Sequence, residues 1–307
     1  SNNSAQIRGG SIYIKNADFI TILNSSFLSC KSNISGGAVY VTDVNTIVKS
    51  MCLFINNTAE WKGGSIYVLH AKKIITTNSN FSTGHQKSIH EKISATNGSG
   101  CFVKNVNIFR SIGCIYSHYT GSFGGALYIA DVYFITFSAI ICYNNSAYNH
   151  KVSKRKVWDI VVNDYKPIGC GGGIFIYGGT QLLFVNSTLI NNTANDSGGG
   201  IFINDIFNVT ILNSIFKKNS ALQYGLAYYA SFVNIFNVIG CTFKENIFVR
   251  EVSGGTFVCN KKTKKIVIIS SIFIKNQIPF RGLYILSTTS CLVLNSRFWL
   301  NSVTWGG

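Results

Sequence analysis

Short apolar runs separated by polar residues recur along the whole chain at a nearly constant spacing. Residues 198–224 read GGGIFINDIFNVTILNSIFKKNSALQY and contain three runs of β type, at Gly200–Ile203, Asn208–Leu212 and Ile215–Lys217. Asn, Asp, Ser and Gly separate these runs, and apolar residues show no helical periodicity. The segment therefore predicts three short strands joined by polar turns.

A small residue that follows a glycine pair marks the same point in each copy of this pattern. The marked residues are Ser11, Ala38, Ser65, Cys101, Ala126, Gly173, Gly200, Ala227, Thr256 and Gly282. Successive marks are 25 to 29 residues apart, except for two longer intervals of 36 and 47 residues. A fixed period of this length is typical of a solenoid, a propeller or another repeat array.

Two further columns of residues keep register with the marked residue. Eight residues ahead of it, most copies carry F-x-x-N or a variant, at Phe54–Asn57, Leu189–Asn192, Phe216–Asn219, Phe243–Asn246, Phe273–Asn276 and Phe298–Asn301. In the same places Phe27 leads to Cys30, Ile115 to His118, and Cys142 to Asn145. An asparagine precedes the Phe position by three residues at Asn24, Asn78, Asn186, Asn213 and Asn295.

The repeat predicts an all-β fold, a right-handed parallel β-helix of about ten coils with about 27 residues per coil. A propeller blade needs about 40 residues and four strands, and the Leu-x-x-Leu-x-Leu pattern of leucine-rich repeats is missing. Coils of a β-helix lie about 4.8 Å apart, so equivalent residues stack in columns. We expect Ile and Phe to stack inward and Asn side chains to pass hydrogen bonds from coil to coil.

Gly36–Tyr40 (GGAVY), Gly124–Tyr128 (GGALY) and Phe54–Asn57 (FINN) resemble the paired GGA[ILV] and FxxN motifs of the polymorphic outer membrane protein (Pmp) repeat family. The resemblance covers nearly the whole chain apart from the two long intervals. It implies a right-handed parallel β-helix that is displayed at a cell surface, often in adhesion.

Composition and charge limit the remaining choices. Of the 307 residues, 47% are hydrophobic and 12% charged, and the formal net charge is +16. The sequence contains no run of about 18 apolar residues, so no transmembrane helix is predicted, and the first residues do not resemble a signal peptide. We interpret residues 1–307 as a single β-helix domain cut from a longer secreted or cell-surface protein. The positive charge favours anionic partners, although it also serves the solubility of an apolar rod.

The two long intervals predict insertions at about residues 85–97 and 147–169, both between the F-x-x-N column and the glycine pair. Loops on one face of a solenoid are commonly its binding surface. The candidate ligand-binding residues are Lys87, Lys92, Lys151, Lys154, Arg155, Lys156, Trp158, Tyr165 and Lys166. Cations beside aromatic rings suit an anionic glycan or an acidic protein surface. A solvated, tolerated insertion is the alternative.

Asparagine and cysteine residues offer weaker signals. The chain holds eleven N-x-S/T sequons, whereas residue frequencies predict about 5 to 6. The glycosylation candidates are Asn33, Asn97, Asn195, Asn56, Asn144 and Asn191. The nine cysteines form no C-x-x-C pair, and most are expected in the core. Cys114 is expected on the opposite strand face from Cys142.

No catalytic residue, metal site or cofactor is predicted. Glycoside hydrolysis needs two carboxylates about 5 to 9.5 Å apart. Asp18, Asp43 and Asp205 instead fall in similar turn positions, which predicts that they mark one solvent-exposed corner. Four of the five histidines map to the corner of the insertions without a ligand spacing typical of zinc. No nucleic-acid motif accompanies the basic residues. The predicted function is an adhesive or structural rod, with end-to-end stacking into a filament or coat, or a β-helix enzyme, as alternatives.

Overall fold

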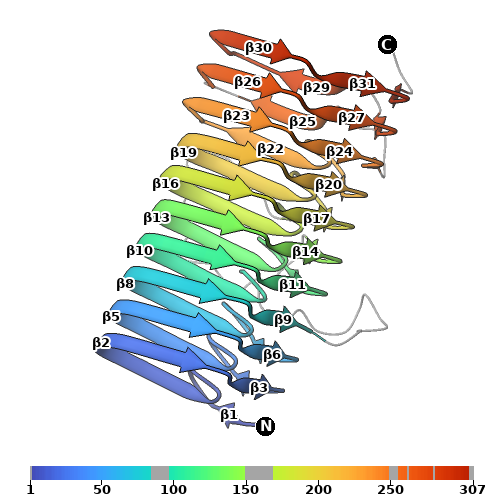
Figure 1. The fold of residues 1–307 in the computed structure, drawn as a ribbon. Coiled ribbons are helices and arrows are strands. Elements are labelled where there is room, and N and C mark those ends of the chain that lie inside the picture. The colour runs from blue at the N-terminus through green and yellow to red at the C-terminus, as the bar shows by residue number, and fades with distance from the viewer. Residues whose placement is uncertain are drawn as a thin grey trace.

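The computed structural model describes residues 2–83, 97–148, 169–248, 255–260, 263–278 and 281–303. Within these ranges every regular element is a β-strand and every strand pair is parallel. Figure 1 shows the strands stacked as rungs from the N-terminal end to the C-terminal end. The predicted parallel β-helix of about 27 residues per turn is confirmed.

The largest sheet runs the length of the rod and contains 13 strands. Seven rows of it are single strands of 12 residues: β2 (Ile12–Leu23), β5 (Val39–Ser50), β8 (Ile66–Thr77), β10 (Cys101–Ile112), β13 (Leu127–Ser138), β16 (Ile174–Val185) and β19 (Ile201–Leu212). Three further rows are strand pairs: β22 (Tyr228–Ser231) with β23 (Ile235–Ile239), β25 (Gly255–Asn260) with β26 (Lys265–Ile269), and β29 (Arg281–Ile285) with β30 (Ser290–Leu294).

A second sheet holds the three-residue strand that follows each row. Its strands are β3 (Ser26–Leu28), β6 (Leu53–Ile55), β9 (Asn80–Ser82), β11 (Ile115–Ser117), β14 (Ile141–Tyr143), β17 (Thr188–Ile190), β20 (Ile215–Lys217), β24 (Thr242–Lys244), β27 (Ile272–Ile274) and β31 (Arg297–Trp299). Two-residue strands close the turn: β1 (Ser4–Ala5), β4 (Lys31–Ser32), β7 (Thr58–Ala59), β12 (Thr120–Gly121), β15 (Ser146–Ala147), β18 (Thr193–Ala194), β21 (Ser220–Ala221), β28 (Gln277–Ile278) and β32 (Ser302–Val303).

The first two runs predicted within each copy form one strand in seven rows, and a single left-handed residue bends that strand. These residues are Asn16, Asp43, His70, Asn105, Asp131, Gly178 and Asp205, with φ between 53° and 70°. Gly has no Cβ to clash there, and Asn and Asp tolerate this conformation better than other side chains. The polar break in the sequence therefore marks a bend within the strand rather than a gap between two strands.

Bulky apolar side chains fill the inside of the coil. The rings of Phe27, Phe54, Phe81 and Tyr116 stack in one column, and those of Phe216, Phe243, Phe273 and Phe298 continue it further along the rod. Neighbouring centroids in this column are 4.6 to 4.9 Å apart. The predicted inward Phe column is present and lies in the main apolar core.

A second aromatic column lies on the outer side of the large sheet. It consists of Tyr13, Tyr40, Tyr67, Phe102, Tyr128, Phe175, Phe202 and Tyr229, with neighbouring centroids 4.7 to 5.2 Å apart. Six of these rings belong to a separate buried cluster. The guanidinium of Arg8 lies 5.1 Å from the Tyr40 ring centroid, and the Lys62 ammonium lies 5.2 Å from that of Phe102. These cations shield the rings from water.

The glycine pair lies where consecutive coils approach most closely. A Cβ on Gly37 would lie 2.0 Å from the carbonyl oxygen of Gly64, so no side chain fits. The small residue that follows the pair is Gly100 in the fourth row, not Cys101, because the amide of Ser65 donates to the Gly100 carbonyl. Cys101 instead pairs with Ile66 and Leu127 and is buried in the core.

The F-x-x-N asparagines form a buried hydrogen-bonded column, as predicted. From Asn145 onward the amide of each donates to the Oδ1 of the next, through Asn192, Asn219, Asn246, Asn276 and Asn301, at 2.9 to 3.2 Å. Each also donates to a carbonyl in the coil before it, as Asn192 does to Cys142 at 2.9 Å. The column therefore ties three successive coils together.

The fourth coil departs from the predicted alignment by one residue. Tyr116, not Ile115, pairs with Cys142 in the Phe column. Tyr119, not His118, takes the Asn position, because its backbone amide donates to Asn145 Oδ1 at 3.0 Å. The ring of Tyr119 is buried, and its hydroxyl lies 2.9 Å from Ser65 Oγ.

Eight of the nine cysteines are buried, and all nine are free thiols. The expectation that Cys114 and Cys142 occupy opposite faces is wrong. Because Tyr116 pairs with Cys142, Cys114 lies two positions before that column and points to the same side. Both side chains are fully buried. The described residues contain no helix long and apolar enough to span a bilayer.

Candidate functional site: a basic face of the rod

All of the ligand-binding residues predicted in the insertions lie outside the described residues: Lys87, Lys92, Lys151, Lys154, Arg155, Lys156, Trp158, Tyr165 and Lys166. The chain on either side of the insertions is described. The described chain resumes at Asn97 and at Gly169, and Asn97 and Cys170 both form bridges with the intervening residue Phe123. The two insertions therefore rejoin the rod at the same corner, two coils apart.

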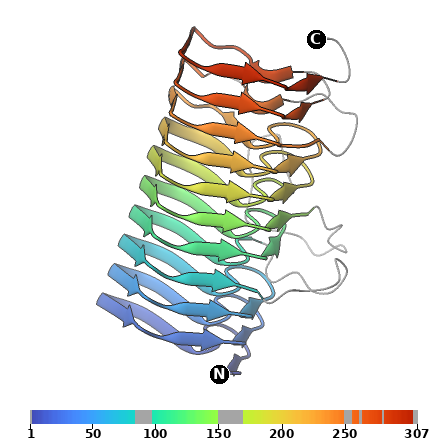
Figure 2. The same cartoon turned by 45° about the vertical axis from the view of Figure 1, so that its right-hand side comes forward.

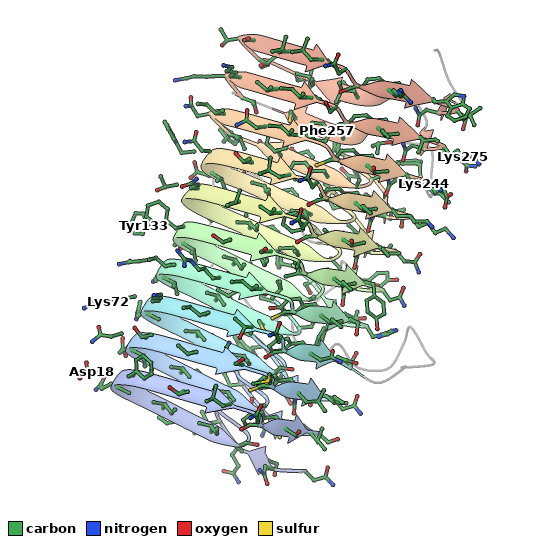
Figure 3. The ribbon with its side chains drawn as sticks, in the orientation of Figure 1. Asp18, Lys72, Tyr133, Lys244, Phe257 and Lys275 are labelled. Carbon is green, nitrogen blue, oxygen red and sulfur yellow. The ribbon has the colours of Figure 1, made fainter. Side chains whose placement is uncertain are left out.

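The sheet of three-residue strands leads into this corner and carries a cluster of cations near the C-terminal end of the rod. We call this cluster the basic face; its members are Lys217, Lys218, Lys244, Lys275 and Arg297. In Figure 3 the labelled Lys244 and Lys275 project outward from the side that bears the three-residue strands. The cluster contains cations from four successive coils.

Strand register explains why these cations gather. Lys217 and Lys244 are direct neighbours in the sheet. The next residue in each coil is left-handed, and Lys218, Glu245 and Lys275 occupy this position with φ of 54°, 55° and 52°. Their backbones are joined, since the amide of Lys218 donates to the Lys244 carbonyl at 3.1 Å. Coil spacing therefore holds the charges about 5 Å apart along the rod axis.

Glu245 is the single acidic residue among these positions in the described coils. Its carboxylate lies 3.4 Å from Lys244 Nζ and 4.0 Å from Lys217 Nζ. Loss of solvent alone would raise the pKa of Glu245, but the hydrogen bond and charge of Lys244, with Lys217 and Lys218, lower it overall. Five cations against one anion leave a formal charge of 5 − 1 = +4 on the basic face.

The same two positions carry no charge in the preceding coils. They hold Leu28 and Ser29, Ile55 and Asn56, Ser82 and Thr83, Ser117 and His118, Tyr143 and Asn144, and Ile190 and Asn191. The exposed amides pair along the rod, since Asn191 Nδ2 donates to Asn144 Oδ1 at 2.8 Å and Asn144 Nδ2 lies 3.2 Å from His118 Nε2. The face therefore changes from neutral amides to cations along its length.

Three glycosylation candidates lie on this amide stretch: Asn56, Asn144 and Asn191 are all exposed. Asn33 is exposed at the following corner and Asn195 is partly exposed there. Asn97 is only 5% exposed, and it bridges Lys62 and Phe123. Its burial argues against a glycan at that position, because the amide must be open to solvent to carry one.

The basic face was readable in the sequence but was not predicted. The variable pair inside F-x-x-N reads Lys-Lys at 217–218, Lys-Glu at 244–245 and Ile-Lys at 274–275. The fixed Phe and Asn of the motif, which predict the fold, are buried. The exposed residues lie between them.

The three aspartates that the sequence predicted at one solvated corner are exposed and all lie at the bend of the large sheet, in two adjacent columns. Asp43 and Asp205 are left-handed bend residues, together with Asp131. Asp18 lies two positions after the bend residue of its own row, Asn16. Among the described residues, no group of three or more His, Cys, Asp or Glu side chains could hold a metal ion.

One segment of the chain is similar to the repeat of a known family. Residues 51–69 match the Chlamydia polymorphic membrane protein (Chlamydia_PMP) repeat. The matched segment runs from the Phe54–Asn57 motif across the glycine pair into β8, so the predicted Pmp resemblance is confirmed. A Pmp repeat on a parallel β-helix indicates a cell-surface or extracellular protein.

One solved structure that is similar to this chain is that of PfbA, a surface adhesin of Streptococcus pneumoniae. The sequences are 12% identical, the alignment covers 100% of this chain and 86% of that chain, and the TM-score is 0.31. A TM-score this low does not establish a shared fold. Among curated proteins none matches the chain.

Proposed function

We propose that this chain is an adhesive rod of a cell surface that binds acidic glycans through its basic face. The observation that carries the proposal is a group of three lysines around the Glu245 carboxylate, followed by Lys275 and Arg297 in the next two coils, whereas the preceding coils are uncharged at the strand-end positions. The Pmp repeat supports the surface location. No catalytic role is assigned, because none of the cations lies beside a candidate nucleophile or paired carboxylates.

A β-helix suits this task because its coils fix the spacing of side chains. Lysine ammonium groups are compact point charges on flexible stems, so a row of them can follow sulfate or carboxylate groups along a polymer. The predicted basic residues of the insertions, such as Lys154 and Arg155, would extend the same surface from the neighbouring corner. We propose that both contribute to one extended anion-binding surface.

Reversing the charge of Lys217, Lys244 and Lys275 to Glu is expected to weaken heparin binding roughly tenfold or more, because each exposed contact contributes about 0.2–1 kcal/mol and reversal adds repulsion. Heparin affinity chromatography and a titration at fixed salt measure the effect. Reversal of Lys15, Lys31 and Lys264, which are exposed elsewhere, is the matched control. An equal loss in the control would show that net charge alone governs retention and would contradict the proposal.

The insertions need a separate test because they lie outside the described residues. Reversing Lys154, Arg155 and Lys156 to Glu is expected to reduce retention on heparin or acidic glycans further. Unchanged retention would show that these residues of the insertions do not contribute to binding, and the proposed function would then rest on the basic face alone.

End-to-end stacking of rods is a second candidate function. Each coil of a β-helix pairs only with its neighbours, so a rod that ends in an open coil can add the coil of another chain. Sedimentation at increasing protein concentration would reveal such stacking, and a rod that stays monomeric throughout would exclude it.

A further inference from the structure

A polar groove lies at the bend of the large sheet, away from the basic face. Its volume is about 510 Å³, and its lining comes from the first four rows of the sheet. The polar lining residues are Asn16, Asp18, Asp43, Asn45, His70, Lys72 and Asn105. In Figure 3 the labelled Asp18 and Lys72 lie along the edge of the rod opposite Lys244 and Lys275.

The bend produces the groove. Asn16, Asp43, His70 and Asn105 are the left-handed residues of rows β2, β5, β8 and β10. In all four rows a second polar side chain follows two residues later, and three of these side chains line the groove: Asp18, Asn45 and Lys72. Two parallel columns of polar groups therefore line the groove, one row about 4.8 Å above the next. Figure 2 shows this stacking of rows from a second direction.

Hydrogen bonds among the lining residues fix the orientation of the acceptors. Asn45 Nδ2 donates to Asp18 Oδ1 at 2.6 Å. The two oxygens of Asp43 are engaged separately, Oδ2 by the Thr42 hydroxyl at 3.0 Å and Oδ1 by His70 Nδ1 at 3.1 Å. Each carboxylate oxygen can accept more than one hydrogen bond. The side chains of His70 and Asp43 remain 51% and 42% exposed, so a ligand can reach them.

The charge of the groove differs from that of the rest of the rod. Two aspartates and one lysine leave a formal charge of −1 with His70 neutral, whereas the whole chain carries +16. An anionic ligand would meet the carboxylates of Asp18 and Asp43. A cation would lack a coordinating group of three carboxylate, imidazole or thiolate ligands, since none exists among the described residues. The lining instead presents both hydrogen-bond donors and acceptors, which hydroxyl groups satisfy.

Exposed aromatic rings border the same columns. Phe19 follows Asp18 directly and is 64% exposed. Further along the rod, Phe134 occupies the column of Phe19 and Tyr133 precedes it as Asp18 precedes Phe19; Tyr133 and Phe134 are 59% and 48% exposed. Figure 3 shows Tyr133 projecting from the same edge as Lys72. A ring that presents an apolar face next to convergent polar groups can pack against the apolar face of a sugar.

We propose that this groove binds an uncharged oligosaccharide. Sugar hydroxyls would bridge Asp18, Asp43 and Asn105, while one sugar ring packs on Phe19. The site goes beyond the proposed binding of acidic glycans, because it lies on another edge of the rod and selects against negative charge. One rod would then hold two glycan sites of different chemistry.

Titration of the whole chain with cellotetraose, chitotetraose and mannotetraose tests this site, by calorimetry and by saturation-transfer NMR. We expect saturable binding of at least one of these probes, little dependence on salt, and no effect of reversing Lys217, Lys244 and Lys275. The double variant Asp18→Ala/Asn45→Ala is expected to weaken that binding at least tenfold, as is Phe19→Ala. Thr180→Ala, an exposed residue of the same column beyond the groove, is the matched control and should bind as the parent does.

Three outcomes would overturn the site. They are absence of saturable binding across the neutral probes, binding that survives both groove variants, and preferential binding of an acidic oligosaccharide that the groove variants abolish. Failure here leaves the heparin result untouched, because the two experiments use different ligands and variants on different edges of the rod. Circular dichroism of each variant checks that the coil stack is intact.

Discussion

Replacing Asn192 with alanine is expected to lower the free energy of unfolding by about 3–5 kcal/mol, since several buried polar groups lose their partners at about 1–3 kcal/mol each. Asn192 is fully buried in the F-x-x-N column. Its Oδ1 accepts from the backbone amide and the side-chain amide of Asn145, at 3.1 and 3.0 Å. Its Nδ2 donates to the Cys142 carbonyl at 2.9 Å and to Asn219 Oδ1 at 3.0 Å.

The size of the effect follows from where those partners lie. The side chain links its own coil to the coils on both sides, and no water reaches the orphaned groups. Alanine would leave the backbone amide of Asn145 without an acceptor and the Cys142 carbonyl without this donor. In a stack where each coil contacts only its neighbours, weakening two interfaces at once divides the rod.

Asn191→Gly is the matched control, because the adjacent residue is exposed and left-handed with φ of 57°. Glycine accepts that conformation, so we expect a loss below about 1 kcal/mol. Denaturant unfolding followed by circular dichroism compares the two variants, and hydrogen exchange locates the weakened coils. Equal stability of Asn192→Ala and the parent would refute the role of the column in joining coils.

The period of the repeat made most of the fold predictable. Gly pairs and F-x-x-N motifs recur because their positions face either a neighbouring backbone or the core, where few side chains fit. Gly37 and Gly64 illustrate this constraint, since the approach of their coils leaves no room for a Cβ. Such close approach of two backbones restricts which residue types fit, so it can be recognised in the sequence.

The fourth coil shows where the sequence was insufficient. Ile115 is an apolar residue next to Tyr116, and Cys101 is a small residue next to Gly100, so each fits the column that its neighbour occupies. Hydrophobicity and size alone therefore allowed a shift of one residue. Backbone pairing decides the register, and a shift of one residue turns every side chain to the other face. Tyr119 can replace the usual asparagine because Ser65 provides a partner for its buried hydroxyl.

The outer aromatic column and the basic face were missed for different reasons. Tyr40 and Tyr67 alternate with inward residues, so a period of two places them outside the coil, yet both are less than 10% exposed. Stacking on neighbouring rings and cover from the preceding corner bury them. The cations of the basic face occupy the unconstrained positions of F-x-x-N, and only the strand register brings Lys217 next to Lys244.

Replacing Lys49 with methionine is expected to raise the free energy of unfolding at neutral pH by about 1–3 kcal/mol, because an apolar side chain of similar shape removes the penalty of a buried amine. Lys49 is only 3% exposed and points into the core. It stacks between Ile22 and Thr76 in adjacent rows. Burial lowers its pKa below 10.5, and the thiols of Cys101, Cys114 and Cys52 offset this only in part.

The sign of the pH dependence follows from that shift. The folded protein holds the Lys49 proton less tightly than the unfolded chain does, so this residue destabilises the fold most below its lowered pKa, where both states are protonated. Stability of the parent should therefore recover as pH rises from the lowered pKa of Lys49 toward 10.5. Lys49→Met should lack this recovery. Its advantage over the parent should shrink at alkaline pH.

Denaturant unfolding of parent and variant across neutral to alkaline pH measures both effects. Lys73→Met is the matched control, because Lys73 lies in the next row on the outer face of the same sheet and is partly exposed. It should change stability by less than about 0.5 kcal/mol and leave the pH profile as it is. A lower stability of Lys49→Met, with the same pH dependence as the parent, would contradict this prediction. It would show that the buried amine stabilises the core.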